Sequence, residues 1–193
     1  MNRKLVAAAS VILFLVIALA AIAGTFLTTA PTYEVTYKEP ASAVHASLGK
    51  TATSNTIALR LNGIADGSDP ATRAAWATLS RLAENGTGLY NVSLTPRSPN
   101  DRYLVANVTV TNAQPTQVPF SYGAFVLLTP NNTAYYANYA ECNRGCVQQA
   151  LQNQTLNAGF SSDLYVLFSV PAGTNVQRIV YTTSNPVIVM SAA

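Results

Sequence analysis

Apolar and polar residues alternate through much of the second half of the chain. The clearest run has apolar side chains at every second position, at Leu104, Ala106, Val108 and Val110. Successive side chains of a strand point to opposite faces, so this run predicts a strand with one buried face. We expect these four side chains to point inward, together with Val166 and Phe168. Leu167 breaks the alternation, which indicates a strand covered on both faces, and the helix predicted below could cover it.

Shorter runs of the same kind predict further strands. They lie at 33–37, 57–61, 90–94, 120–128, 134–139, 164–170, 176–182 and 187–190. Turn-forming residues separate several of them, at 96–100, 130–132 and 171–173. The polar stretch 42–54 and the stretch 142–153 have no such pattern, and we expect loops there, with a short helical excursion possible in the second. Many strands divided by turns favour an antiparallel β-sandwich.

One soluble helix is predicted over 70–84. Asp69 is a suitable N-cap, and Pro70 suits the first helical position, where its missing N–H costs nothing. The apolar residues at helical spacing are Ala75, Trp76, Leu79, Leu82 and Ala83. Asn85-Gly86 follows as a C-terminal stop. Trp76 could be a stacking platform for a ligand, but its spacing favours a role as the helix's anchor in the core.

The N-terminus carries an apolar segment. Arg3 and Lys4 precede 23 residues without a charge, from Leu5 to Leu27. A membrane-spanning helix needs about 20 apolar residues, whereas the apolar part of a secretion signal needs about 7–15. The length favours a retained transmembrane helix, although cleavage after Ala23 is the alternative because 21–23 has the small-x-small form. Both interpretations place the rest of the chain outside the cytoplasm.

These patterns divide the chain into three parts. Residues 1–27 form the membrane anchor or signal segment, 28–55 a stalk or first strand followed by a loop, and 56–193 the sandwich with its inserted helix.

Composition agrees with an exported protein and argues against a nucleic-acid binder. Only 10% of residues are charged, against about 25% in average soluble domains. Without Arg3 and Lys4 the chain has nine basic and eight acidic residues, so no basic footprint for phosphates is visible. Asn-x-Ser/Thr sequons make Asn85, Asn91, Asn131 and Asn153 candidates for glycosylation. A fifth sequon, at Asn107, lies inside a predicted strand.

The two cysteines, Cys142 and Cys146, are expected to form a disulfide. Outside the reducing cytoplasm such a pair is oxidised by default, and Gly145 gives the short loop backbone freedom. A loop shaped in this way would present Arg144 as a contact surface, or the bridge could be a purely local clip.

We expect no catalytic residues, no cofactor and no metal site. His45 is the only histidine, and no G-x-S-x-G elbow accompanies it. The two cysteines have too few partners for tetrahedral zinc. An S-x-x-K sequence at 47–50 lacks its companion motifs, and the acidic stretch 66–69 supplies too few oxygens for calcium.

Four motifs, in order, resemble those of a prokaryotic family of secreted immunoglobulin-like domains of unknown function, found in lipoproteins and anchored surface proteins. They are Val105-Ala106-Asn107-Val108-Thr109-Val110-Thr111-Asn112, Phe125-Val126-Leu127-Leu128-Thr129-Pro130-Asn131-Asn132-Thr133-Ala134-Tyr135, Leu156-Asn157-Ala158-Gly159 and Val166-Leu167-Phe168-Ser169-Val170-Pro171. The resemblance covers about 102–190 and implies an immunoglobulin-like antiparallel β-sandwich. It implies no chemistry.

Two functions follow as expectations. The first is a non-enzymatic, membrane-tethered surface domain that binds other proteins or builds the cell envelope. The second is a subunit of an extracellular filament, because an apolar N-terminal helix before a glycosylated sandwich resembles the layout of archaeal type IV pilins. Lys4-Leu5 lacks the small residue usual at the pilin processing site. Residues 33–37 could instead donate a strand to a neighbouring copy, or form an ordinary edge strand.

Overall fold

The computed structural model describes residues 35–76, 98–142 and 153–193, and the compact unit to which they belong runs from Val35 to Ala193. Several expectations lie outside these ranges: the anchor with its cleavage alternative, the strand at 90–94, the helix beyond residue 76, Asn85, Asn91, Arg144 and Cys146. Within the described ranges, no helix is long and apolar enough to cross a membrane.

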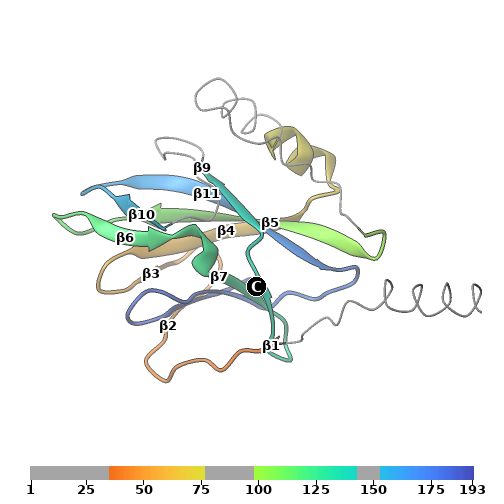
Figure 1. The fold of residues 1–193 in the computed structure, drawn as a ribbon, viewed down its shortest axis with the longest axis horizontal. Coiled ribbons are helices and arrows are strands. Elements are labelled where there is room, and N and C mark those ends of the chain that lie inside the picture. The colour runs from red at the N-terminus through yellow and green to blue at the C-terminus, as the bar shows by residue number, and fades with distance from the viewer. Residues whose placement is uncertain (1–34, 77–97, 143–152) are drawn as a thin grey trace, which may run out of the picture. The chain divides into compact units, whose positions relative to one another are not determined.

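The fold is a mainly β sandwich with one short helix, as Figure 1 shows. The five-stranded sheet has the order β3 (Thr51–Thr53), β4 (Ala58–Asp66), β5 (Asp101–Thr111), β11 (Ser161–Pro171) and β9 (Tyr139–Cys142). The six-stranded sheet has the order β1 (Val35–Thr36), β8 (Thr133–Tyr136), β7 (Phe125–Leu128), β12 (Arg178–Tyr181), β13 (Ile188–Ser191) and β2 (Val44–Ala46). A small third sheet pairs β10 (Asn153–Leu156) with β6 (Val118–Ser121), and a 3₁₀ turn, η1 (Tyr122–Ala124), follows β6. The strand pairs are antiparallel except β13 with β2.

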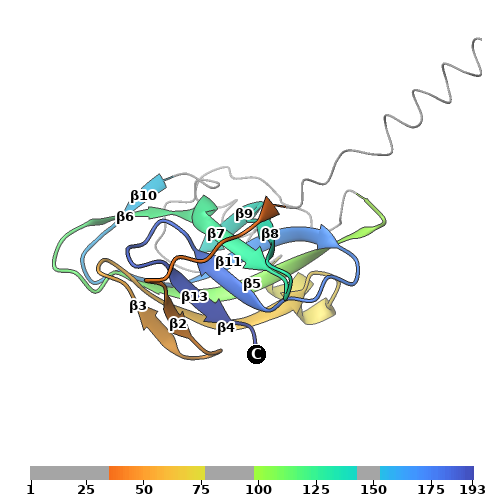
Figure 2. The same ribbon diagram turned by 90° about the horizontal axis from the view of Figure 1, so that it is seen from below.

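The main core fills the space between the sheets and confirms the predicted inward faces. Leu104, Ala106, Val108 and Val110 are buried there, as are Val166 and Phe168. Leu167 is buried on the opposite face of β11, against Trp76 and Val105. The helix that begins at residue 70 therefore covers this face, as the break in alternation at Leu167 indicated (Figure 2).

Predicted turns are also confirmed where positive φ angles occur. Asn132 has a φ of 63° at the end of the β7–β8 turn, and Gly173 has a φ of 84° in the turn after β11. Glycine, and to a lesser degree asparagine, adopts this left-handed conformation readily.

Two predicted strands are each divided between sheets. The run 134–139 becomes β8 and β9, which lie in different sheets, because the N–H of Ala137 bonds to Phe125 O while that of Asn138 bonds to Leu167 O. The run 120–128 is likewise split by η1 into β6 and β7. An apolar run does not reveal which partner each residue will pair with, so the pattern alone predicted one strand in each case.

Residues 35–55 contribute short strands to both main sheets. This stretch, expected to be a stalk or first strand and then a loop, contributes β1, β2 and β3. β2 and β3 have three residues each, too few for a period-two pattern, whereas β1 lies within the alternating run 33–37. β4, predicted over 57–61, continues to Asp66 through a register shift between Leu61 and Gly63, which is a β-bulge.

Candidate functional site

The helix lies over the outer face of the five-stranded sheet and is fixed at its N-terminus. The Asp69 carboxylate accepts hydrogen bonds from the backbone N–H of Thr72 at 2.9 Å and from its hydroxyl at 3.0 Å. This is the N-cap that the sequence predicted, with Pro70 as the first helical residue.

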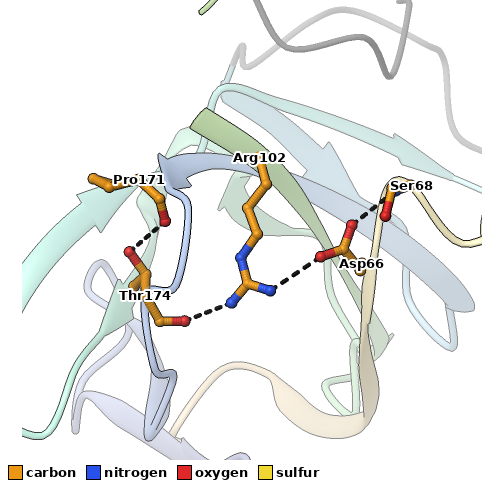
Figure 3. A network of polar contacts seen from close by, with 5 residues as sticks. All are labelled: Asp66, Ser68, Arg102, Pro171 and Thr174. Carbon is orange, nitrogen blue, oxygen red and sulfur yellow. Dashed lines mark hydrogen bonds and ion pairs between the residues drawn. The ribbon is translucent and has the colours of Figure 1, made fainter. Parts of the chain in front are cut away.

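A polar network holds the loop that leads into this helix (Figure 3). Arg102 at the start of β5 donates to Asp66 at 3.0 Å and to the carbonyl of Thr174 at 2.6 Å. The backbone N–H of Ser68 donates to the other Asp66 oxygen at 2.8 Å. Hydrogen bonds from Ser68, and then the Arg102 guanidinium, hold the pKa of Asp66 below its usual value.

Gly67 brings the loop close to β5. Its N–H donates to Tyr103 O at 2.7 Å, and its own carbonyl accepts from Arg73 Nε at 3.1 Å. A Cβ atom at Gly67 would lie 3.1 Å from Tyr103 Cβ and 3.2 Å from Tyr103 O. Glycine at this position permits the close approach of the two backbones, and a Cβ atom would require Tyr103 to shift.

Between helix and sheet lies a pocket of about 330 Å³. Ala71 and Ala75, one turn apart on the helix, contribute only methyl groups to its wall, and these small side chains leave the space open. Its other apolar lining residues are Ile64, Ala65, Trp76, Val105 and Tyr165. Asn62, Gly63, Thr72 and Asn107 complete the lining and supply polar atoms. The pocket thus combines an apolar lining with a few polar groups, as ligand sites commonly do.

A ladder of polar side chains continues from the pocket across β4, β5 and β11. We call it the Thr109 ladder, and its members are Arg60, Asn62, Asn107, Thr109 and Asp163. Thr109 donates its hydroxyl proton to Asp163 at 2.7 Å, while its oxygen accepts from Asn62 Nδ2 at 2.9 Å and Arg60 at 3.3 Å. Asn62 also donates to Asn107 at 3.0 Å and accepts from Arg60 Nε at 2.9 Å. These bonds fix the orientation of each side chain before any partner arrives.

The outer face of the other sheet is covered by the chain itself. β1 and β2 are the opposite edges of the six-stranded sheet, so residues 37–43 cross its face and bury Val126, Val180 and Val189. We call this stretch the crossing segment, and Figure 1 shows it between β1 and β2. Glu39 within it accepts from Arg178 at 2.7 Å and lies 2.9 Å from His45 Nε2. The pocket described above lies on the outer face of the other, five-stranded sheet.

The residues singled out from the sequence are dispersed. His45 lies on β2 in contact with Glu39, on the outer side of the six-stranded sheet. In the described ranges, no three His, Cys, Asp or Glu side chains are close enough to hold a metal ion. Asn131 is exposed in the β7–β8 turn, whereas Asn153 begins β10. Cys142 ends β9, but its pairing with Cys146 cannot be followed within the described ranges and stays a prediction.

The pocket and the Thr109 ladder were missed as a site. Asn62, Asn107 and Thr109 are ordinary outward positions of alternating strands, and Ala71 and Ala75 look like an ordinary helix face. The sequence did contain a signal for this site. Polar residues on neighbouring strands point to the same sheet face that the apolar side of the helix covers. Recognising it requires the strand register, which pairs Leu61 with Val108 and Leu164 with Val108.

No family model matches the chain, and no curated protein matches its sequence. Among solved structures, the fold is similar to MPT63, a secreted protein from Mycobacterium tuberculosis, with a TM-score of 0.49 and 11% identity over 79% of this chain and 99% of MPT63. It is also similar to a β-sandwich protein from Clostridium difficile 630, with a TM-score of 0.46 and 10% identity over 81% of this chain and 99% of that one.

Proposed function

We propose that this chain is a non-enzymatic surface protein that binds another protein through the outer face of its five-stranded sheet. We further propose that the segment from Leu5 to Leu27 tethers it to the membrane and that the sandwich stands outside the cytoplasm. The observation that carries the binding function is the pocket beneath the helix, continuous with the ordered Thr109 ladder.

The geometry supports binding because the polar side chains beside the pocket are already oriented by hydrogen bonds to one another. An apolar pocket with oriented polar groups beside it resembles the combination of apolar core and polar rim in protein-binding interfaces. Fixing the ladder in advance lowers the entropy lost when a partner docks. His45, the side chain best suited to acid–base chemistry, forms its contact with Glu39 on the other sheet and does not line the pocket.

An immunoglobulin-like topology is part of this proposal. Its support is the way the chain alternates between the sheets, from β5 to β7 and β8, back to β9 and β11, and again to β12 and β13. Such crossings between two packed antiparallel sheets are typical of immunoglobulin-like sandwiches.

The filament function remains the alternative. β1 pairs with β8 of its own chain, which is the ordinary edge-strand arrangement, so strand donation by 33–37 loses support. A pilin-like assembly would depend on the segment from Leu5 to Leu27, which lies outside the described ranges.

Site-specific photo-crosslinking in the native host tests the binding function. A photoreactive amino acid at Ala71, on the pocket wall, should yield a discrete crosslinked product of higher mass on intact cells. The same group at Thr183, exposed in the turn between β12 and β13, is the control and should yield none. Equal products from both positions, or none from Ala71, would refute binding at this face.

A further inference from the structure

We infer that the pocket and the Thr109 ladder together recognise a segment of a partner protein that carries a bulky apolar side chain beside a carboxylate. The inference rests on the proposed function and names the chemistry of its partner.

The pocket sets the apolar requirement. Its volume of about 330 Å³ lies at the lower end of the roughly 300–1,000 Å³ usual for small-molecule sites. A pocket of this size has room for one bulky apolar side chain. Trp76 and Val105, both buried, contribute to the lining, and the small side chains of Ala71 and Ala75 leave the opening.

Arg60 sets the charge requirement. Its guanidinium is exposed, and its contacts are with the neutral oxygens of Asn62 and Thr109. Within the described ranges Arg60 takes part in no ion pair. The carboxylate of Asp163 accepts a hydrogen bond from the Thr109 hydroxyl. A guanidinium has five N–H donors, so these two contacts leave donors available for a carboxylate.

The two requirements are linked through Asn62. Asn62 lines the pocket and accepts the hydrogen bond from Arg60 Nε, so the cation is one side chain away from the pocket. A partner would therefore present its carboxylate within about two residues of its apolar side chain, since consecutive residues are separated by about 3.8 Å.

A library of displayed random dodecapeptides, selected on the full-length protein in detergent, tests the inference. We expect enriched peptides to carry Leu, Ile, Met, Phe or Trp with Asp or Glu within two positions. Replacing that acid by its amide in a synthetic peptide should weaken binding roughly fivefold at low salt, and less at high salt.

Three variants separate the parts of the inference. Arg60→Gln should remove the preference for an acid but keep the apolar one, Ala75→Leu should remove both by filling the pocket, and Lys38→Gln, an exposed cation in the crossing segment over the other sheet, should change neither. Trp76 fluorescence and thermal unfolding check that each variant folds. Ala71→Leu is a second way to fill the pocket and replaces Ala75→Leu if that variant does not fold.

Enrichment of apolar residues without an acid would overturn the inference and leave the proposed function standing. If the same peptides are still enriched on the pocket-filling variants Ala75→Leu and Ala71→Leu, both the inference and the proposed function would be overturned. If isocaproate alone bound as tightly as the best peptide, the occupant would be a small amphipathic acid, and the assignment to a protein segment would be wrong.

Discussion

The side-chain amide of Asn112 donates a hydrogen bond to the carbonyl oxygen of Leu156, 3.0 Å away, and so joins the end of β5 to the end of β10. The same amide donates to Thr116 O and Asn157 O, and its oxygen accepts from the N–H of Gln114. Asn112 is 1% exposed, so no water replaces these bonds if they are lost.

Asn112→Ala should therefore lower the free energy of unfolding by about 2–3 kcal/mol, because buried carbonyl groups lose their donor. Urea unfolding followed by circular dichroism measures this. The control is Gln117→Ala, which removes an exposed hydrogen bond to Asn157 in the same turn and should change stability by less than about 0.5 kcal/mol. Similar losses in the two variants would contradict the role given to Asn112.

Gly67→Ala should loosen the attachment of the helix. The added Cβ would lie 3.1 Å from Tyr103 Cβ and 3.2 Å from Tyr103 O, and strain of this kind costs about 1–3 kcal/mol. Trp76 is the only tryptophan, so a shift of its emission to longer wavelength reports the loosening directly. Gly63→Ala is the matched control, because a Cβ there has nothing within 4 Å. If both variants behave alike, crowding at Tyr103 is not the reason for Gly67.

Asp66 should make stability depend on acidity. The pKa of Asp66 in the folded protein is lowered, first by the hydrogen bonds from Ser68 and then by Arg102. The ionised carboxylate therefore stabilises the folded state at pH values above the unfolded pKa, and this stabilisation is lost as the pH falls through the folded pKa. Asp66→Asn should flatten the stability curve below about pH 4. Ser68→Ala should flatten it in part, because the backbone N–H of Ser68 remains as a donor. An unchanged curve in Asp66→Asn would refute the assignment.

Tyr181 should affect stability at neutral and at alkaline pH. Its buried hydroxyl accepts from the N–H of Ser121 at 2.9 Å, so Tyr181→Phe should cost about 1–2 kcal/mol at pH 7. Burial raises the pKa of Tyr181 in the folded protein. The neutral phenol therefore stabilises the folded state below the unfolded pKa of about 10, and this stabilisation is lost as the pH rises through the folded pKa.

Unfolding measured from about pH 9 to 12 should accordingly show a smaller alkaline loss in Tyr181→Phe than in the native chain. Tyr136→Phe is the control: Tyr136 is 56% exposed, and its replacement should leave neutral stability unchanged. The proposed role fails if the two phenylalanine variants lose equal stability at pH 7.

Sequence patterns predicted the features that depend on near neighbours. Val108 and Val110 are buried because a strand alternates its faces, and Asp69 caps the helix because its carboxylate reaches Thr72 three residues on. Each of these relationships is set within a few residues.

Features that join distant parts of the chain were not predictable in this way. Glu39 meets Arg178 across 139 positions, and Thr109 meets Asp163 across 54. Both pairs depend on strand register and on which sheet each strand joins. The division of 134–139 at Asn138 has the same origin, since alternation continues whether or not the chain changes sheets.

The parallel pairing of β2 with β13 has a consequence for the order of events in folding. Val44 lies opposite Ile188, so the edge of the six-stranded sheet is completed by residues near the two ends of the folded unit. Contacts so far apart in sequence form late, because closing a long loop costs entropy before any contact compensates for it. The sandwich can therefore close only after nearly all of the unit from Val35 to Ala193 has been synthesised.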